Sequence, residues 1–134
     1  MSDSDVELVS AAYAAFNRGG ESFLEYLDPE VEWIPAAQFV QGPVHGIDEL
    51  RGLLDTFRDA FEEIRWEPQR VVEASEPGEV LVLIETVTRG RGSGVEIRLR
   101  VAHLVRVRNG KIVWGKVYPD ADAGLEAAGL DPAP

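Results

Sequence analysis

Hydrophobic and polar residues alternate almost without a break over residues 98–107, "RLRVAHLVRV". This period of two predicts a β-strand with one buried face and one polar face. His103 lies in the apolar row of the strand, whereas the opposite row carries arginines. An imidazole in such a row is either a core histidine, bonded to a backbone carbonyl or to Tyr13, or a side chain that lines a pocket.

The rest of the pattern predicts helices first and strands afterwards. Apolar residues at helical spacing predict a helix over residues 5–17, capped by Ser4 or Asp5 and ended by "NRGG". A short helix over "ESFLEYL", a brief strand over "EVEWIP" and a loop over "AAQFVQGPVHG" are expected next. The clearest helix is expected from Ile47 to about Glu63, with an apolar face formed by Leu50, Leu53, Leu54, Phe57 and Phe61. Strands and a short terminal helix follow over "RWEPQRVVEA", "EVLVLIETVTR", "GVEIRLRVAHLVRVR", "KIVWGKVY" and "DADAGLEAAGLDPAP".

Two turn motifs set the expected strand register. Asn109-Gly110 between two strand patterns predicts a two-residue hairpin turn, and "GRGSG" at residues 90–94 predicts a looser one. Pairing residue 90 with residue 95 brings opposite charges together, Glu85 with Arg100 and Arg89 with Glu96. On the apolar face, the same register sets Val82 beside His103 and Ile84 beside Val101. It also sets Thr86 beside Leu99.

The facing of the strand "KIVWGKVY" depends on the turn before it. A strict two-residue turn pairs residue 116 with residue 103 and turns Lys116 inward, whereas a one-residue bulge turns Trp114, Lys116 and Tyr118 outward. An unpaired lysine beside a buried histidine is costly, so the outward arrangement is favoured.

Composition narrows the class of protein. The 134 residues are 45% hydrophobic and 28% charged, which predicts one globular domain over residues 1–134, with an ordered core over about 6–130. A net charge of −11 argues against nucleic acid and anionic membranes as partners. There is no cysteine, no visible signal peptide and no apolar run longer than "VLVLI", so we expect a cytoplasmic protein. No metal-ligand spacing or nucleotide fingerprint is present, so we expect neither a metal nor a cofactor.

Five segments, in this order and spacing, are similar to a known family: "AAYAAFNRGG", "LDPEVEWIP", "GPVHGIDELRGLL", "RNGKIVWGKVYPD" and "GLEAAGL". Together they resemble the SnoaL-like and ketosteroid isomerase-like branch of the nuclear transport factor 2-like superfamily, over about residues 6–130. The resemblance implies an α+β cone, in which a strongly curved antiparallel sheet wraps around three N-terminal helices and encloses a pocket. It does not imply one reaction, because the fold hosts isomerases, hydrolases, cyclases, dehydratases and binders without catalysis.

The resemblance also implies which positions carry chemistry. The general-base carboxylate of ketosteroid isomerases matches Trp33, and Glu32 beside it faces the other side of the strand. The acid that donates to the oxyanion matches His103. Tyr13 lies near the tyrosine donor of the family, but that tyrosine aligns with Ala12, about 100° around the helix. We therefore expect no ketosteroid isomerase activity.

Two classes of function remain open. One is a cofactor-independent isomerase, cyclase, hydratase or dehydratase for a small apolar carbonyl or polyketide-like compound, in which His103 moves a proton and Tyr13 donates to the oxyanion. The other is a module without catalysis, which binds a hydrophobic ligand or serves only for dimerisation. The residues expected to shape the pocket of an enzyme or of a ligand-binding module are Trp33, Phe57, Trp66, Val82, Ile84, Thr86 and Val101.

The outer face of the sheet is the expected contact between copies. In the family a second copy commonly packs on this face, so the resemblance implies a homodimer. We place five residues on the face, Arg98, Arg100, Arg106, Val113 and Val117. His45 in "GPVHG" is expected to be a solvated loop residue.

Overall fold

The chain folds into one curved sheet of six strands with helices on both faces, as the computed structural model of residues 2–19, 21–35 and 42–131 describes it. The helices are α1 (Ser2–Asn17), α2 (Glu21–Leu24), α3 (Gly46–Ala60) and α4 (Ala121–Ala127). The strands are β1 (Leu27–Ile34), β2 (Val44–His45), β3 (Phe61–Glu73), β4 (Glu79–Gly90), β5 (Glu96–Arg108) and β6 (Lys111–Tyr118). Their order across the sheet is β2-β1-β6-β5-β4-β3, with β1 and β6 parallel and the other neighbours antiparallel.

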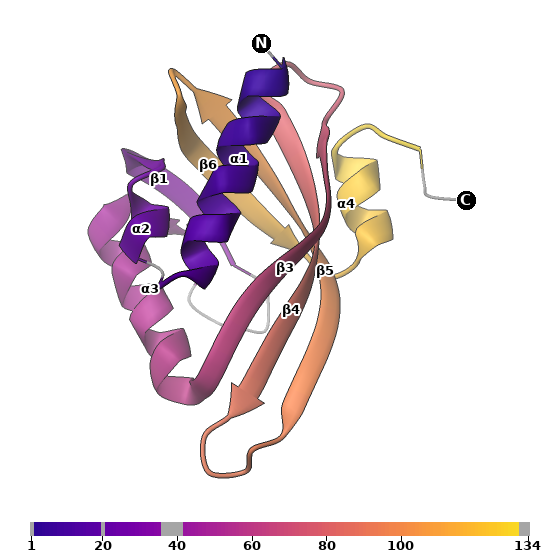
Figure 1. The fold of residues 1–134 in the computed structure, drawn as a ribbon. Helices are drawn as coiled ribbons and strands as arrows, with labels where there is room; N and C mark the ends of the chain where they lie inside the picture. The colour runs from indigo at the N-terminus through magenta and orange to yellow at the C-terminus, as the bar shows by residue number, and fades with distance from the viewer. Residues whose placement is uncertain (1, 20, 36–41, 132–134) are drawn as a thin grey trace.

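The sheet bends around α1 without closing into a barrel, and α1, α2 and α3 lie on its concave side (Figure 1). The main core lies between this side and the helices, with Val9, Phe23, Leu50 and Val82 among its buried residues. A smaller cluster, which includes Leu81, Ala102 and Leu125, joins α4 to the outer face. None of the helices in the described ranges has both the length and the apolar character needed to cross a bilayer.

The turn motifs and the register they predict are confirmed. Asn109 and Gly110 have φ values of 53° and 75°, and Arg108 pairs with Lys111 across them. In the β4–β5 ladder Glu85 lies opposite Arg100, and Val82 lies opposite His103. The apolar row of β5 therefore faces the helices, as the alternation predicts.

A bulge decides the facing of β6. The register shifts between Arg106 and Val107, so that Val117 lies opposite His103 and Lys116 lies opposite Leu104. Lys116 therefore faces outward, as expected from the cost of burying an unpaired ammonium group. The placement of Val117 on the outer face was wrong, because the same bulge turns its side chain to the concave side, where it packs against the main core.

Several predicted boundaries shift. The helix expected to reach Glu63 ends at Ala60, because Phe61 adopts an extended backbone (φ −125°, ψ 140°) and pairs with Gly90. The helix expected over "ESFLEYL" is only four residues long. The predicted loop after Pro35 contains strand β2, which pairs with β1, and its residues 36–41 lie outside the described residues.

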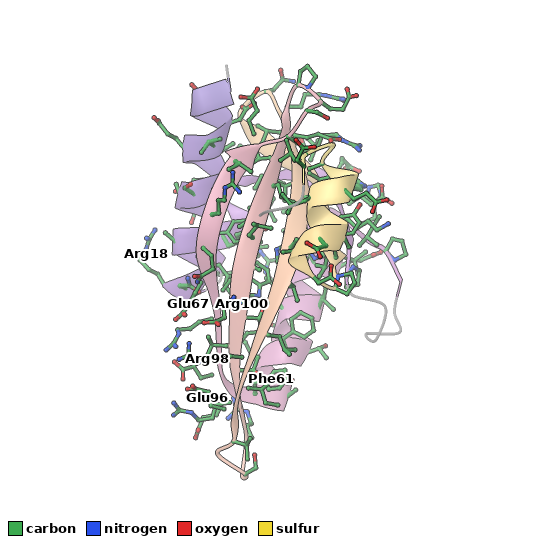
Figure 2. All side chains as sticks on the ribbon, turned by 90° about the vertical axis from the view of Figure 1, so that its right-hand side faces the viewer. Arg18, Phe61, Glu67, Glu96, Arg98 and Arg100 are labelled. Atoms are coloured by element: carbon green, nitrogen blue, oxygen red, sulfur yellow. The ribbon has the colours of Figure 1, made fainter. Side chains whose placement is uncertain are left out.

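The arginine row of β5 lies on the outer face, as predicted, and acids of the same chain pair with it. Arg98 lies 3.0 Å from both Glu85 and Glu96, and Arg106 lies 2.8 Å from Glu79. Figure 2 shows Glu67, Glu96 and Arg98 on the side of the sheet away from Phe61. These partly exposed pairs contribute little stability each, but they leave this surface close to neutral.

Candidate ligand pocket

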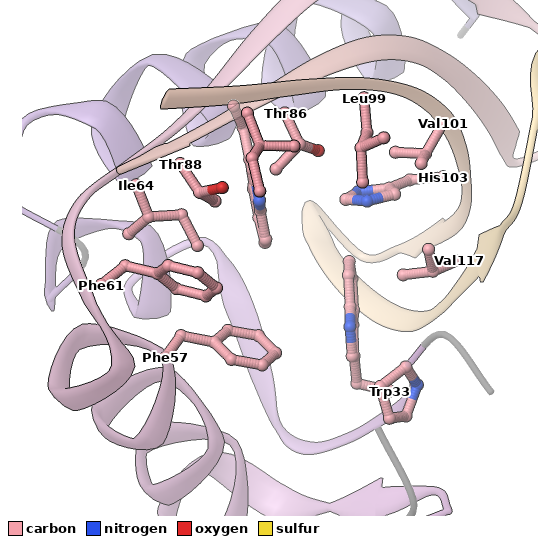
Figure 3. Close-up of a pocket in the computed structure, with 13 residues that line it drawn as sticks. Trp33, Phe57, Phe61, Ile64, Thr86, Thr88, Leu99, Val101, His103 and Val117 are labelled. Carbon is pink, nitrogen blue, oxygen red and sulfur yellow. The ribbon is translucent and has the colours of Figure 1, made fainter. Parts of the chain in front are cut away.

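A cavity of about 210 Å³ lies between the concave face of the sheet, β1 and α3 (Figure 3). Aromatic residues form much of its wall, namely Trp33, Phe57, Phe61 and Trp66. Aliphatic residues form most of the rest, namely Pro35, Ile64, Ile97, Leu99, Val101 and Val117. The remaining lining residues are Thr86, Thr88 and His103, so no charged carboxylate or ammonium group faces the cavity among the described residues. Such a wall suits an uncharged, largely apolar molecule.

Three side chains are held in place by close packing at the inner end of the pocket. Trp66 stacks on Phe16 with ring centroids 3.7 Å apart and planes within 6°. Trp33 meets the His103 ring edge-on at 5.5 Å, and Trp66 meets it edge-on at 5.0 Å. Gly115 of β6 makes room for Trp33, since a Cβ at that position would overlap the indole ring. The imidazole is therefore fixed between two indoles.

Tyr13 is the hydrogen-bond partner of His103. The phenol oxygen lies 2.8 Å from Nδ1, and both side chains are buried, with His103 only 2% exposed. Burial lowers the pKa of His103 from 6.5 to about 3 and raises the pKa of Tyr13. Both groups are therefore neutral at pH 7.

The hydrogen-bond pattern assigns the tautomer of His103. Within the described residues the Tyr13 hydroxyl has no other acceptor, so it donates to Nδ1 and the imidazole proton resides on Nε2. If Nδ1 carried the proton, the buried hydroxyl hydrogen would lack a partner, which costs free energy. His103 thus borders the cavity as a neutral ring with one N–H donor left over.

The two interpretations of His103 left open by the sequence are therefore both realised, because the ring bonds to Tyr13 and also borders the cavity. Tyr13 itself does not line the cavity. Its ring is fully buried against Phe23 and Trp66, which, with His103, take up the space on the pocket side. Its hydroxyl therefore acts on a ligand only through the imidazole.

Five of the seven residues expected to shape the pocket do line it, namely Trp33, Phe57, Trp66, Thr86 and Val101. Val82 and Ile84 do not, and at 0% and 1% exposure they belong to the main core. The physical reason is that α1 packs across β3 and β4 at this end of the sheet and fills the space above them. Glu32 is exposed while Trp33 is buried. The position on β1 that matches the general base of ketosteroid isomerases therefore carries an indole, and the neighbouring carboxylate points away from the pocket.

Several wall residues were not among the predicted site residues. Ile97 and Leu99 continue the row of His103, and Thr88 continues the row of Thr86, so the alternation could have identified them. Phe61 was assigned to a helix, and its place on the wall follows only from the start of β3. In the described chain no group of three acidic or histidine side chains is arranged to hold a metal ion.

Asn17, at the end of α1, fixes the backbone of Trp66. Its side-chain amide donates to the Trp66 carbonyl oxygen at 2.6 Å, and its side-chain oxygen accepts from the Trp66 N–H at 2.8 Å. β3 is an edge strand, so these two backbone groups have no strand partner on that side. Asn17 supplies the missing pair of bonds and sets the position of an indole in the pocket wall.

Arg91 joins the tip of the β4–β5 hairpin to the end of α3. Its guanidinium donates to the carbonyl oxygens of Arg58 at 2.8 Å and Asp59 at 3.1 Å, which lack helical partners at a C-terminus.

We expect Arg91→Ala to lower the free energy of unfolding by about 1 kcal/mol, measured by urea denaturation. Arg108→Ala, at the exposed end of β5, is the control and should change it far less. Equal losses would contradict the capping role.

The comparisons with known proteins agree with this architecture. The family model for the SnoaL-like domain matches residues 9–114, which is most of the chain. No curated protein matches it in sequence. TerC, co-crystallised with polyporic acid, superposes with a TM-score of 0.76 at 22% identity, over 94% of this chain and 98% of TerC.

Two further structures share the fold. A nuclear transport factor 2-like protein from Burkholderia pseudomallei K96243 has a TM-score of 0.76 at 24% identity, over 94% of this chain and 97% of its own. A ketosteroid isomerase-like protein from Catenulispora acidiphila DSM 44928, in complex with trimethylamine, has a TM-score of 0.73 at 15% identity, over 96% and 98%. The chain has a nuclear transport factor 2-like fold and belongs to the SnoaL-like domain family.

Proposed function

We propose that this chain binds a small, uncharged ring compound that presents one hydrogen-bond acceptor, such as a carbonyl oxygen, to His103. The observation that carries the proposal is the neutral imidazole, bonded to Tyr13 through Nδ1 and bordering an otherwise apolar cavity. Nε2–H is then the donor that orients the ligand. An apolar wall with one well-placed polar group is typical of small-molecule sites.

The cavity is large enough for a small ring compound. A dry cavity of about 150 Å³ accommodates benzene, and this one measures about 210 Å³. The volume therefore accommodates one substituted ring. TerC with polyporic acid and the Catenulispora acidiphila protein with trimethylamine are relatives in fold that were solved with small molecules, which supports the general class of function.

The proposal is tested with two ligands of nearly equal shape, acetophenone and α-methylstyrene, in which a methylene group replaces the carbonyl oxygen. One hydrogen bond is worth about 0.5–1.5 kcal/mol, so the chain should prefer acetophenone by about 2- to 10-fold. Binding is measured by ligand-observed NMR and by quenching of the indole fluorescence.

Two variants check the assignment of the donor. His103→Phe keeps a flat ring but removes Nε2–H, so it should bind both ligands without preference. Thr86→Val, the matched control on the same wall, should keep the preference. A preference that survives in His103→Phe would refute His103 as the donor. Absence of saturable binding of either ligand by the unmodified chain at millimolar concentration would refute the binding function.

A cofactor-independent isomerase, cyclase, hydratase or dehydratase reaction on the same ligands is the second candidate. It is favoured by the neutral donor, because a hydrogen bond that polarises a carbonyl group stabilises developing oxyanion character. The described part of the wall carries no carboxylate to remove a proton, so binding alone has the stronger support. A catalytic role requires His103→Asn to lower the turnover of an identified substrate, and unchanged turnover would exclude it.

Pairing of two copies is part of the proposal, as the resemblance to the family implies. The arginine row is not a free basic surface for an acidic partner, because Arg98 and Arg106 already pair with acids of their own chain. Analytical ultracentrifugation that gives a monomer across the accessible concentrations would refute the dimer. The cytoplasmic location stays a prediction from the sequence.

A further inference from the structure

The indole of Trp33 carries a polar group that the fold leaves unpaired. Its side chain is only 3% exposed, and among the described residues its N–H has no hydrogen-bond acceptor. A buried indole N–H usually has a partner, because an unpaired donor costs free energy. In the wall of a pocket, such a group is a candidate contact for a ligand.

The N–H of Trp33 reaches the cavity. In the described ranges, the one fully enclosed side-chain nitrogen or oxygen without a partner is Nε of Arg65. The unpaired nitrogen of Trp33 is therefore not sealed in by protein atoms, and the space that this indole borders is the pocket. The ring thus serves the pocket both as an apolar wall and as a hydrogen-bond donor.

Gly115 determines which edge of the indole is left free. A Cβ at Gly115 would overlap Cζ3 and Cε3 of Trp33, so this edge of the ring lies against β6. Nε1 belongs to the opposite edge of an indole, which is therefore the edge turned away from Gly115. Figure 3 shows the Trp33 ring projecting toward His103. The N–H edge is thus the part of the ring that a ligand can contact.

His103 and Trp33 are close enough for one ring to contact both. Their ring centroids are 5.5 Å apart, and they belong to different strands, β5 and β1. The hydroxyl groups of the wall are more distant, because Thr86 lies opposite Leu99, which is four residues from His103 along β5. At about 3.3 Å per residue this separation is about 13 Å along the strand. A single ring bonded to His103 therefore reaches Trp33 before Thr86.

We propose that the ligand is a ring with two carbonyl groups on opposite carbons, one bonded to Nε2–H of His103 and the other to the indole N–H of Trp33. The inference rests on the proposed function and names its ligand class, a cyclic diketone or a quinone. Such compounds carry acceptors and no donor, which complements two N–H groups that border the same cavity. Trp33 is then a residue that determines specificity as well as shape.

The test compares cyclohexanone with 1,4-cyclohexanedione, two uncharged rings of nearly equal size that differ in one carbonyl group. Because the dione is better hydrated, the quantity compared between variants is the ratio of the two dissociation constants, measured by ligand-observed NMR titration. Trp33→Phe keeps an aromatic ring but removes the N–H, so it should lower the relative affinity for the dione by about 2- to 10-fold, the effect of one hydrogen bond. Trp114→Phe, the same substitution on the outer face, is the matched control and should leave the ratio unchanged.

The indole signals of the unmodified chain give a second measurement, which holds even if Trp33→Phe fails to fold. The chain has three tryptophans, so its proton–nitrogen correlation spectrum contains three indole signals. Neither ligand has an aromatic ring current, and a hydrogen bond to a carbonyl oxygen shifts an N–H proton downfield. The dione should therefore move the Trp33 signal further downfield than cyclohexanone does, while the Trp114 signal stays in place.

The outcomes separate this inference from the proposed function. A lower relative affinity for the dione in Trp33→Phe and a downfield shift of the Trp33 signal support Trp33 as the second donor. An unchanged ratio in a folded Trp33→Phe, or a shift confined to the Trp66 signal, would overturn the inference while His103 stays the first donor. Absence of saturable binding of both rings would overturn the dicarbonyl class, and the acetophenone experiment then tests the proposed function by itself.

Discussion

Trp66→Ala is expected to lower the free energy of unfolding by about 3–5 kcal/mol, the usual cost of truncating a large buried aromatic residue. The indole is only 6% exposed and contacts the rings of Phe16, Phe23 and Tyr13 as well as His103. Its removal leaves a void that merges with the pocket, so the loss of packing is only partly recovered by relaxation. Urea denaturation followed by far-ultraviolet circular dichroism measures the change without relying on indole fluorescence.

Trp114→Ala is the matched control for this variant. Trp114 is half-buried on the outer face, where the guanidinium of Arg106 lies 4.3 Å from its ring centroid. A partly exposed cation–π contact contributes about 0.5–1 kcal/mol, and the indole also packs at the margin of the smaller cluster, so the loss should be smaller than for the buried Trp66. If the two variants lose the same stability, Trp66 is not the centre of the aromatic packing that the structure indicates.

Acid should destabilise the protein through His103. In the unfolded chain the imidazole takes up a proton below about pH 6.5, whereas in the folded protein its pKa is about 3. The unfolded state therefore binds more protons between these values, and stability is lost as the pH falls. The contribution of this one group is about 2 kcal/mol at pH 5 and about 3 kcal/mol at pH 4, relative to pH 7.

Two variants isolate this contribution from that of the carboxylates. In His103→Phe the pH dependence between pH 7 and pH 4 should be shallower by the amounts given above, measured as the free energy of unfolding at each pH. His45→Asn removes an exposed histidine that is 3.0 Å from Glu30, and it should retain the steep dependence. Parallel curves for the unmodified chain and His103→Phe would show that the imidazole titrates normally in the folded state.

Much of the sheet could be predicted from the sequence because its signals are local. Asn109-Gly110 imposes a turn that few other residues accept, and the charges of Glu85 and Arg100 fit only one register. The alternation around His103 identified the face that borders the cavity. These features depend on residues that are near one another in the chain or directly paired.

The remainder depends on contacts between distant elements. Phe61 continues the apolar period of α3, but its pairing with Gly90 draws it into β3. Val82 and Ile84 belong to the same row as Thr86, and only the course of α1 over β4 decides that they are core and Thr86 is pocket wall. Tyr13 and His103 are 90 positions apart, and the burial that lowers the pKa of His103 and keeps the imidazole neutral is a property of the tertiary structure.

The amide of Asn17 has a consequence for the growth of larger assemblies. By occupying the N–H and C=O of Trp66, it removes two backbone groups through which another strand could pair with the edge strand β3. Pro68, two residues further along β3, has no N–H to offer. Pairing of another strand with this part of β3 is thereby blocked, which counters aggregation through one of the two edges of the sheet.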